Sequence, residues 1–165
     1  MSFVRKLTPH VLAGFMAVIF LDSLRFKFTD HPKTQVIFGA LNAWAGSLGL
    51  EGLFGHTGLF SQYVIGSIEL LAAALLIAGM APRMQRLQAA GSLAAFLVMA
   101  GAVSFHLFTP LGIDPNHDGA GLFAAACANL AFSLVMILGL RRRELAQFAQ
   151  AFAALFAPTA HGYRA

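Results

Sequence analysis

Four long apolar stretches, separated by charged or turn-forming residues, dominate the pattern of hydrophobic and polar positions along the chain. They cover residues 7–28, 60–81, 87–108 and 119–140. An α-helix needs roughly 20 mainly apolar residues to cross the hydrocarbon core of a bilayer. Each stretch therefore predicts one spanning helix. The pattern predicts an all-α fold, a four-helix transmembrane bundle that forms a single transmembrane domain over residues 1–165.

The connection over residues 29–59 is too long and too apolar for a solvated loop. Apolar residues recur in it at helical spacing: Ile37, Leu41, Trp44 and Leu48. Residues at this spacing share one face of an α-helix. The segment therefore predicts a short helix that lies in the membrane interface or packs on the mouth of the bundle, with Trp44 at headgroup level.

The tail over residues 141–165 begins with three arginines and then repeats this kind of stripe with Leu145, Phe148, Phe152 and Leu155. It predicts an amphipathic C-terminal helix on the cytoplasmic surface. Residues 109–118, by contrast, contain Pro110, Gly112 and Pro115, which interrupt a helix. They predict a turn-rich loop between the third and fourth spans.

Lysine and arginine gather on one side of the four predicted spans. Of the 11 basic residues, three fall on one side, namely Arg25, Lys27 and Lys33, and eight on the other. The eight are Arg5, Lys6, Arg83, Arg86, Arg141, Arg142, Arg143 and Arg164. Cytoplasmic loops carry the excess of Lys and Arg. The distribution therefore predicts an N-in/C-in topology, with residues 29–59 and 109–118 outside the cytoplasm.

The composition agrees with a membrane protein. The 165 residues are 58% hydrophobic and 11% charged, whereas soluble domains are about a quarter charged. The net charge of +4 is too scattered to form a face that follows nucleic-acid phosphates. Cys127 is the single cysteine, which excludes an internal disulfide and any multi-cysteine metal site within the chain.

Small residues predict where the helices pack closely. Ala90, Ala94 and Gly101 lie on the third predicted span, and four alanines surround Cys127 on the fourth. Small side chains allow helix backbones to approach in a membrane. We therefore expect these residues to form contacts inside the bundle.

Glu69 lies nine positions into the second stretch, which places its Cα atom roughly 13 Å below the outer end of that helix at ~1.5 Å per residue. This is near the middle of a hydrocarbon core of ~30 Å. A carboxylate at that depth costs at least a few kcal/mol unless it is paired or protonated. The sequence therefore predicts a partner for Glu69.

The first stretch offers this partner. Asp22 and Arg25 lie three residues apart and share a helix face. Because helix side chains lean toward the N-terminus, Arg25 is directed toward the depth of Glu69. We expect Arg25, flanked by Asp22, to pair with Glu69, and Lys27 is the other candidate. The cluster either fixes the register of two helices or makes Glu69 a proton-accepting or ligand-binding carboxylate; the sequence leaves both open.

Histidine and acidic residues on the predicted outer side form a second candidate site, an outer ligand or metal cluster. Its members are His56, His106, Asp114, His117 and Asp118. Imidazole and carboxylate groups are ligands for zinc, copper or iron. However, none of the histidine spacings forms a metal-binding motif on one helix. His106 lies inside a span, where a lone histidine could ligate a haem or hydrogen-bond a quinone carbonyl.

Two segments make the chain resemble the DoxX-like superfamily of small four-helix membrane proteins. They are FLDSLRFKF at the end of the first span and IGSIELLAAALLIAGMAPR in the second. By this resemblance, Lys27 and Glu69 occupy recurring basic and acidic positions of the family. It implies a multi-pass protein of the bacterial inner (plasma) membrane. The chain departs from common members in its long first outer connection, in residues 105–119 and in its arginine-rich tail.

The family also directs the functional expectations, because some members look like membrane subunits of thiosulfate:quinone oxidoreductases. The main hypothesis is a non-catalytic membrane subunit that anchors or accompanies a redox or bioenergetic complex, with a quinone as the cofactor the resemblance suggests. The expected partners are the lipid bilayer and either other membrane subunits or a second copy of the chain. The alternatives are a small-molecule or proton transporter or channel working as an oligomer, and a metal- or haem-binding oxidoreductase. No catalytic residue is predicted.

Overall fold

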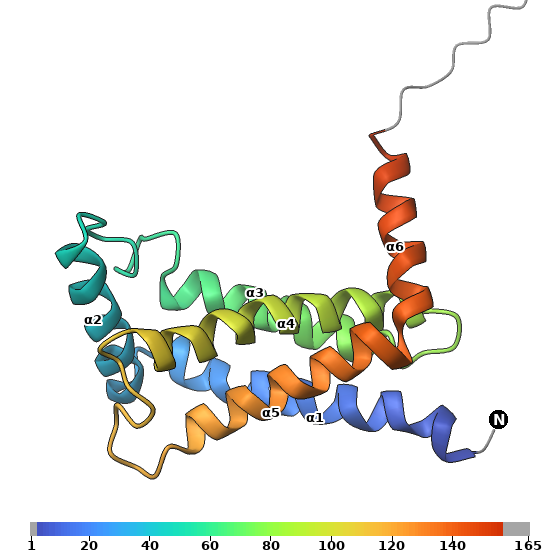
Figure 1. Ribbon diagram of the computed structural model, residues 1–165, viewed down its shortest axis with the longest axis horizontal. Coiled ribbons are helices and arrows are strands. Elements are labelled where there is room, and N and C mark those ends of the chain that lie inside the picture. Colours follow the sequence, from blue (N-terminus) through green and yellow to red (C-terminus); the bar gives the residue numbers. More distant parts are fainter. Residues whose placement is uncertain (1–2, 157–165) are drawn as a thin grey trace, which may run out of the picture.

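The computed structural model describes residues 3–156, and within this part all regular structure is helical (Figure 1). The elements are α1 (Phe3–Lys27), α2 (Pro32–Ser47), α3 (Gln62–Ala78), α4 (Gln85–Phe108), α5 (Gly121–Val135), a π-helical turn (Met136–Leu140) and α6 (Arg142–Ala154). The predicted all-α fold is confirmed.

Four of these helices, α1, α3, α4 and α5, lie side by side and form the bundle, with α3 packed between α1 and α4. Three segments are long and apolar enough to cross a membrane: Lys6–Lys27, Gln85–Phe108 and Gly121–Leu140. The fourth, α3, is apolar but has only 17 residues. It begins at Gln62 because the Ser61 hydroxyl accepts a hydrogen bond from the Val64 backbone amide, as an N-cap does.

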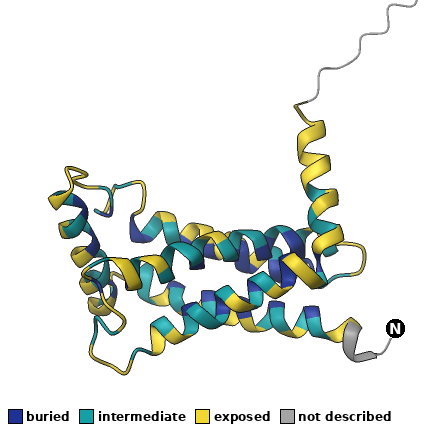
Figure 2. Cartoon of the chain, viewed as in Figure 1, coloured by how far each residue is buried: buried dark blue, intermediate teal, exposed yellow. Residues whose placement is uncertain are grey.

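The bundle core consists of small and flexible apolar side chains. Met16, Phe20, Leu76 and Met136 are fully buried, and alanines from α1, α3 and α4 fill the space between them. Figure 2 shows the buried residues along the facing sides of these helices. A Cβ atom on Gly91 would lie 2.8 Å from the backbone nitrogen of Leu76, so α3 and α4 approach closely at this glycine.

α2 lies across one end of the bundle, which we call the α2 end. Leu41 and Ala45 are buried there with Phe54 and Leu111, and the Trp44 ring packs edge-on against Phe105 with 6.2 Å between centroids. The helix predicted between residues 29 and 59 is therefore present and packs on the bundle mouth. Leu48, which we expected on the same face, is exposed because the helix ends at Ser47.

The opposite end, which we call the α6 end, holds the beginning of α1, the turn between α3 and α4, and α6. The π-helical turn and Arg141 change the chain direction, so that α6 runs across the bundle axis (Figure 1). None of the α6 residues is buried. The predicted C-terminal helix is therefore present; the remainder of the tail, with Arg164, lies outside the described residues.

Candidate functional site

Glu69 forms the centre of a buried polar cluster within the bundle. It is 3% exposed and lies on a mainly apolar helix. The Lys27 Nζ atom lies 2.9 Å from the Glu69 Oε2 atom. The Ser23 hydroxyl donates to the same oxygen at 2.5 Å and accepts from Lys27 Nζ at 2.8 Å. The three side chains close a triangle in which each one contacts the other two.

The local geometry of α1 and α3 explains this cluster. Ser23 and Lys27 lie four residues apart, so they share one face of α1. Side chains of a helix lean toward its N-terminus, which brings the Lys27 ammonium to the depth of Ser23. Gly66, one turn before Glu69 on α3, leaves room for the Lys27 stem: a Cβ atom there would lie 3.5 Å from Lys27 Cδ.

The predicted pairing of Arg25 with Glu69 is wrong. Arg25 forms an ion pair with Asp22 at 2.9 Å, with side chains that are 69% and 58% exposed, and its guanidinium lies over the Phe26 ring. Arg25 and Lys27 are two residues apart, which separates them by roughly 200° around the helix. Since α1 presents Lys27 to α3, Arg25 and Asp22 face away from it. Ser23 was not predicted, although its spacing to Lys27 was a usable signal.

A second polar network continues from this cluster toward the α2 end. The Gln62 side-chain amide donates to the Lys27 backbone oxygen at 2.9 Å and to a carboxylate oxygen of Asp30. Tyr63 donates to the same Asp30 oxygen at 2.7 Å, and Gln35 donates to Gln62 Oε1 at 2.8 Å. The hydrogen bond from Tyr63 holds the pKa of the Asp30 carboxyl below its ordinary value. Sequence reasoning missed this network because its members come from separate elements with no common spacing.

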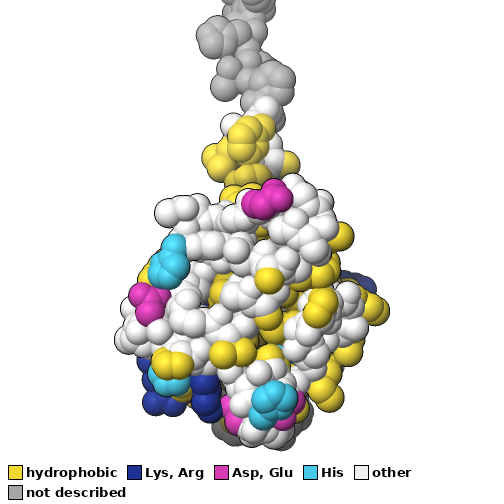
Figure 3. Space-filling model, turned by 90° about the vertical axis from the view of Figure 1, so that its left-hand side faces the viewer, with side chains coloured by type: hydrophobic (Ala, Val, Ile, Leu, Met, Phe, Trp, Pro, Cys, Tyr) yellow, Lys and Arg dark blue, Asp and Glu magenta, His cyan; other side chains and the backbone are white. Residues whose placement is uncertain are grey.

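The predicted outer ligand or metal cluster is not assembled. Figure 3 looks onto the α2 end and shows the histidine side chains at separate places on this face. The His106 Nδ1 atom lies 2.5 Å from the Gly112 backbone oxygen, whereas His56 Nε2 lies 4.0 Å from Asp30. Among residues 3–156, no group of three or more His, Cys, Asp or Glu side chains could hold a metal ion.

The remaining predicted members of that cluster stabilise the loop before α5. Asp114 accepts hydrogen bonds from the backbone amides of Asp118 and Gly119 at 2.9 and 3.1 Å, and these bonds lower the pKa of its carboxyl. The His117 backbone amide donates to the Asp114 backbone oxygen. The Asp118 carboxylate pairs with Lys33 at 2.7 Å, which ties this loop to α2. These groups are engaged in local contacts instead of converging on one point.

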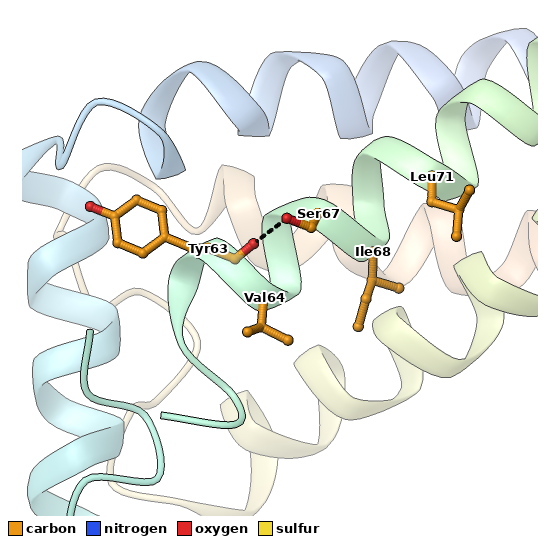
Figure 4. A pocket seen from close by; sticks show the side chains of 5 residues that line it. All are labelled: Tyr63, Val64, Ser67, Ile68 and Leu71. Atoms are coloured by element: carbon orange, nitrogen blue, oxygen red, sulfur yellow. Dashed lines mark hydrogen bonds between the residues drawn. The ribbon is translucent and has the colours of Figure 1, made fainter. Parts of the chain in front are cut away.

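Two hollows lie beside the polar clusters. A groove of about 380 Å³ runs along α3 and is lined by Tyr63, Val64, Ser67, Ile68 and Leu71 (Figure 4). A smaller pocket of about 150 Å³ lies between α2 and the loop that follows it, lined by polar and aromatic residues that include Asn42, Phe54 and His56. The first hollow is mainly apolar and the second mixed.

Arg141 at the α6 end and Asn129 within α5 are buried polar residues whose burial the sequence analysis did not predict. The Arg141 Nε atom donates to Gln88 Oε1 at 2.6 Å, and burial lowers the pKa of the Arg141 guanidinium. Asn129 on α5 is fully buried, and its side-chain amide has no hydrogen-bond partner among the described residues. Burying a charged or unpaired polar group costs free energy, yet no residue spacing in the sequence indicates that Arg141 and Asn129 are buried.

No family model, curated protein or solved structure matches the chain.

Proposed function

We propose that the chain is a multi-pass protein of the bacterial inner membrane with four spans and both termini in the cytoplasm. Three long apolar segments support the first, third and fourth spans. The second span is α3, whose 17 residues extend about 25 Å at ~1.5 Å per residue. Short spans are accommodated by local thinning of the bilayer. The excess of basic residues at the α6 end supports the orientation.

Within the membrane, we propose, the chain is a non-catalytic subunit that anchors or accompanies a redox or bioenergetic complex, as its resemblance to the DoxX-like superfamily suggests. The observation that carries this proposal is the engagement of the buried charges. Glu69 is satisfied by Lys27 and Ser23, and buried apolar side chains form the core of the bundle. The interior of the bundle therefore has a structural role. We place the functional contacts on the lipid-facing surface of the bundle.

The α3 groove is the part of that surface best suited to a partner. Its lining is mainly apolar, and Val64, Ile68 and Leu71 are each at least one-third exposed. The apolar lining of the groove suits the tail of a quinone. However, both hydroxyls that line the groove are engaged, because Tyr63 donates to Asp30 and Ser67 donates to the Tyr63 backbone oxygen. The groove thus fits the apolar tail of a quinone or a partner helix better than a quinone ring.

The test is affinity purification of the full chain in a mild detergent, with the stoichiometry of co-eluting chains measured by native mass spectrometry. We expect stoichiometric membrane partners with the unaltered chain. Ile68→Trp, which fills the groove, should release them, whereas Val18→Trp on the exposed side of α1 should not. A monomer with no stoichiometric partner, or equal retention by both variants, would contradict the proposal for this surface.

Proton transport is a second candidate, favoured by one observation. Polar groups extend from Glu69 toward Asp30 at the α2 end: the Lys27 Nζ atom donates to Glu69, and the Lys27 backbone oxygen and Asp30 both accept from Gln62. If protons cross the membrane through these groups, the chain in proteoliposomes should conduct protons, and Glu69→Gln should abolish this flux. Asp22→Asn is the control, because it alters only an exposed ion pair and should leave the flux intact. Flux that persists in Glu69→Gln, or no flux at all, would exclude this candidate.

A further inference from the structure

We infer that α6 is a membrane-surface helix that binds the anionic phospholipid headgroup layer at the α6 end of the bundle; the inference rests on the proposed membrane placement. α6 leaves the bundle across its axis (Figure 1). If the bundle axis follows the membrane normal, α6 lies in the plane of the membrane surface. It starts at Arg142, directly after the last apolar turn of the fourth predicted span.

Polar contacts hold α6 in this direction. The Arg141 guanidinium, which is buried at the corner, donates to Gln88 on α4 at 2.6 Å and lies 3.5 Å from Glu144 on the first turn of α6. One turn further along, Arg86 on α4 donates to Gln147 at 3.1 Å. These contacts tie two successive turns of α6 to the end of α4. The crossing direction is therefore a property of the fold.

The apolar residues of α6 occupy one side of the helix. At about 100° per residue, they fall within one arc: Leu145, Phe148, Phe152 and, just past the helix, Leu155 and Phe156. The rings of Phe148, Phe152 and Phe156 form a row, with neighbouring centroids 6.4 and 5.2 Å apart. Phe152 is 56% and Phe156 74% exposed. Among the described residues, these rings stack only on one another, and the row becomes more exposed from Phe148 toward Phe156.

The apolar side of α6 is directed toward the region beside the spans. Figure 3 views the molecule from the α2 end, along the bundle, and the surface of α6 that extends beyond the bundle in this view is largely hydrophobic. This is the side that lipid tails around the bundle would meet. Aromatic and aliphatic residues on the buried side of an in-plane helix are typical of interfacial anchors.

The charges at the α6 end select anionic lipid. Five exposed cationic side chains surround this end, namely Lys6, Arg83, Arg86, Arg142 and Arg143. Glu144 is the only acidic residue described there. Basic residues next to a membrane surface are attracted to anionic headgroups, and the attraction is screened by salt. A second copy of the chain would carry the same cationic end, so charge opposes pairing through this surface.

The experiment places one tryptophan on α6 of the full chain. Trp44→Phe removes the native reporter, and Phe152→Trp adds one on the apolar side; Gln150→Trp is the matched control on the polar side. Each protein is reconstituted in nanodiscs of phosphatidylcholine alone or mixed with phosphatidylglycerol. Tryptophan emission is measured with brominated lipids and with iodide as quenchers.

We expect blue-shifted emission and quenching by brominated lipid at position 152, and iodide-accessible emission at position 150. The lipid quenching at 152 should be stronger with phosphatidylglycerol and should fall when Arg142→Gln and Arg143→Gln are combined. Equal behaviour of the two reporters would overturn the inference, as would a blue shift without lipid quenching, which indicates a protein partner. If the membrane placement itself is wrong, the chain will fail to enter nanodiscs, which size-exclusion chromatography reports separately.

Discussion

At the scale of single residues, the Lys27–Glu69 pair makes a quantitative prediction. Removing one member leaves the other charge buried, which is destabilising by about 3–5 kcal/mol, whereas removing both can be nearly neutral. Lys27→Met and Glu69→Gln should therefore each lower the free energy of unfolding by amounts of this order. The double variant should recover part of the loss. Unfolding of the four proteins in one detergent, followed by tryptophan emission and circular dichroism, measures this cycle.

Arg25 supplies the matched control for that cycle. Its ion pair with Asp22 is exposed, and exposed pairs contribute about 0–1 kcal/mol. Arg25→Met should therefore change stability far less than Lys27→Met. Strict additivity of the Lys27 and Glu69 losses, or an Arg25 effect as large as theirs, would mean that the buried pair does not stabilise the fold as described.

The same residues show how far the sequence could determine the cluster. The depth of Glu69 followed from its place in an apolar stretch, and its burial is confirmed. The choice between Arg25 and Lys27 depended on the rotation of α1 about its axis. An amphipathic stripe would have set that rotation, but α1 is apolar over most of its circumference. The buried Asn129 gave no signal, because an isolated polar residue in an apolar stretch does not reveal which neighbour it meets.

At the scale of elements, the contact between α3 and α4 depends on Gly91. A Cβ atom there would lie 2.8 Å from Leu76 N and 3.0 Å from Ala72 O. Overpacking of this kind is destabilising by about 1–3 kcal/mol, so Gly91→Ala should lower the thermal midpoint in detergent. Gly101→Ala is the control, because a Cβ atom there meets nothing within 4 Å. It should be neutral or stabilising by up to about 1 kcal/mol; the reverse order would contradict the packing.

The sequence located the small residues of α4 that lie at the bundle contact but not the ones that are most buried there. Of the residues expected in the bundle, Ala94 packs against the core and Ala90 and Gly101 are partly buried, whereas the small apolar residues that are buried are Ala89, Gly91 and Ala95. Small side chains occur throughout this stretch, so their positions alone do not show which of them faces the neighbouring helix. The ends of the helices were predicted more accurately than their packing faces, because prolines, glycines and capping residues interrupt the apolar runs at definite places.

The loop before α5 makes a pH-dependent prediction. Backbone amides donate to the Asp114 carboxylate and lower its pKa, so the folded loop favours the ionised form. Its stabilising contribution is complete above the ordinary aspartate pKa of about 3.9 and is lost as the pH falls through the lowered folded-state pKa. Asp114→Asn should therefore be less stable than the unaltered chain at neutral pH. Thermal unfolding at several pH values should show this difference shrinking on acidification; a difference that is constant or grows would refute it.

At the scale of the whole molecule, the two ends of the bundle differ in charge, and this difference predicts how the chain crosses the membrane. Arg83 and Arg86 lie in and just after the turn between α3 and α4, and Arg86 donates to Gln147 on α6, the helix that begins with Arg142 and Arg143. The α2 end instead carries Asp30, Asp114 and Asp118. Because an excess of Lys and Arg stays in the cytoplasm, the α6 end should be cytoplasmic and the α2 end outside.

Cysteine labelling in intact cells tests this orientation, and Cys127→Ala provides the background because it removes the single native cysteine. Asn116→Cys places a thiol in the loop at the α2 end, and Met84→Cys places one in the exposed turn at the α6 end. An impermeant maleimide should modify position 116 in intact cells and position 84 only after the membrane is opened. The two positions lie at opposite ends of α4, so a single crossing separates them. The reverse labelling pattern would invert the topology, and labelling of both from outside would mean that α4 does not cross the membrane.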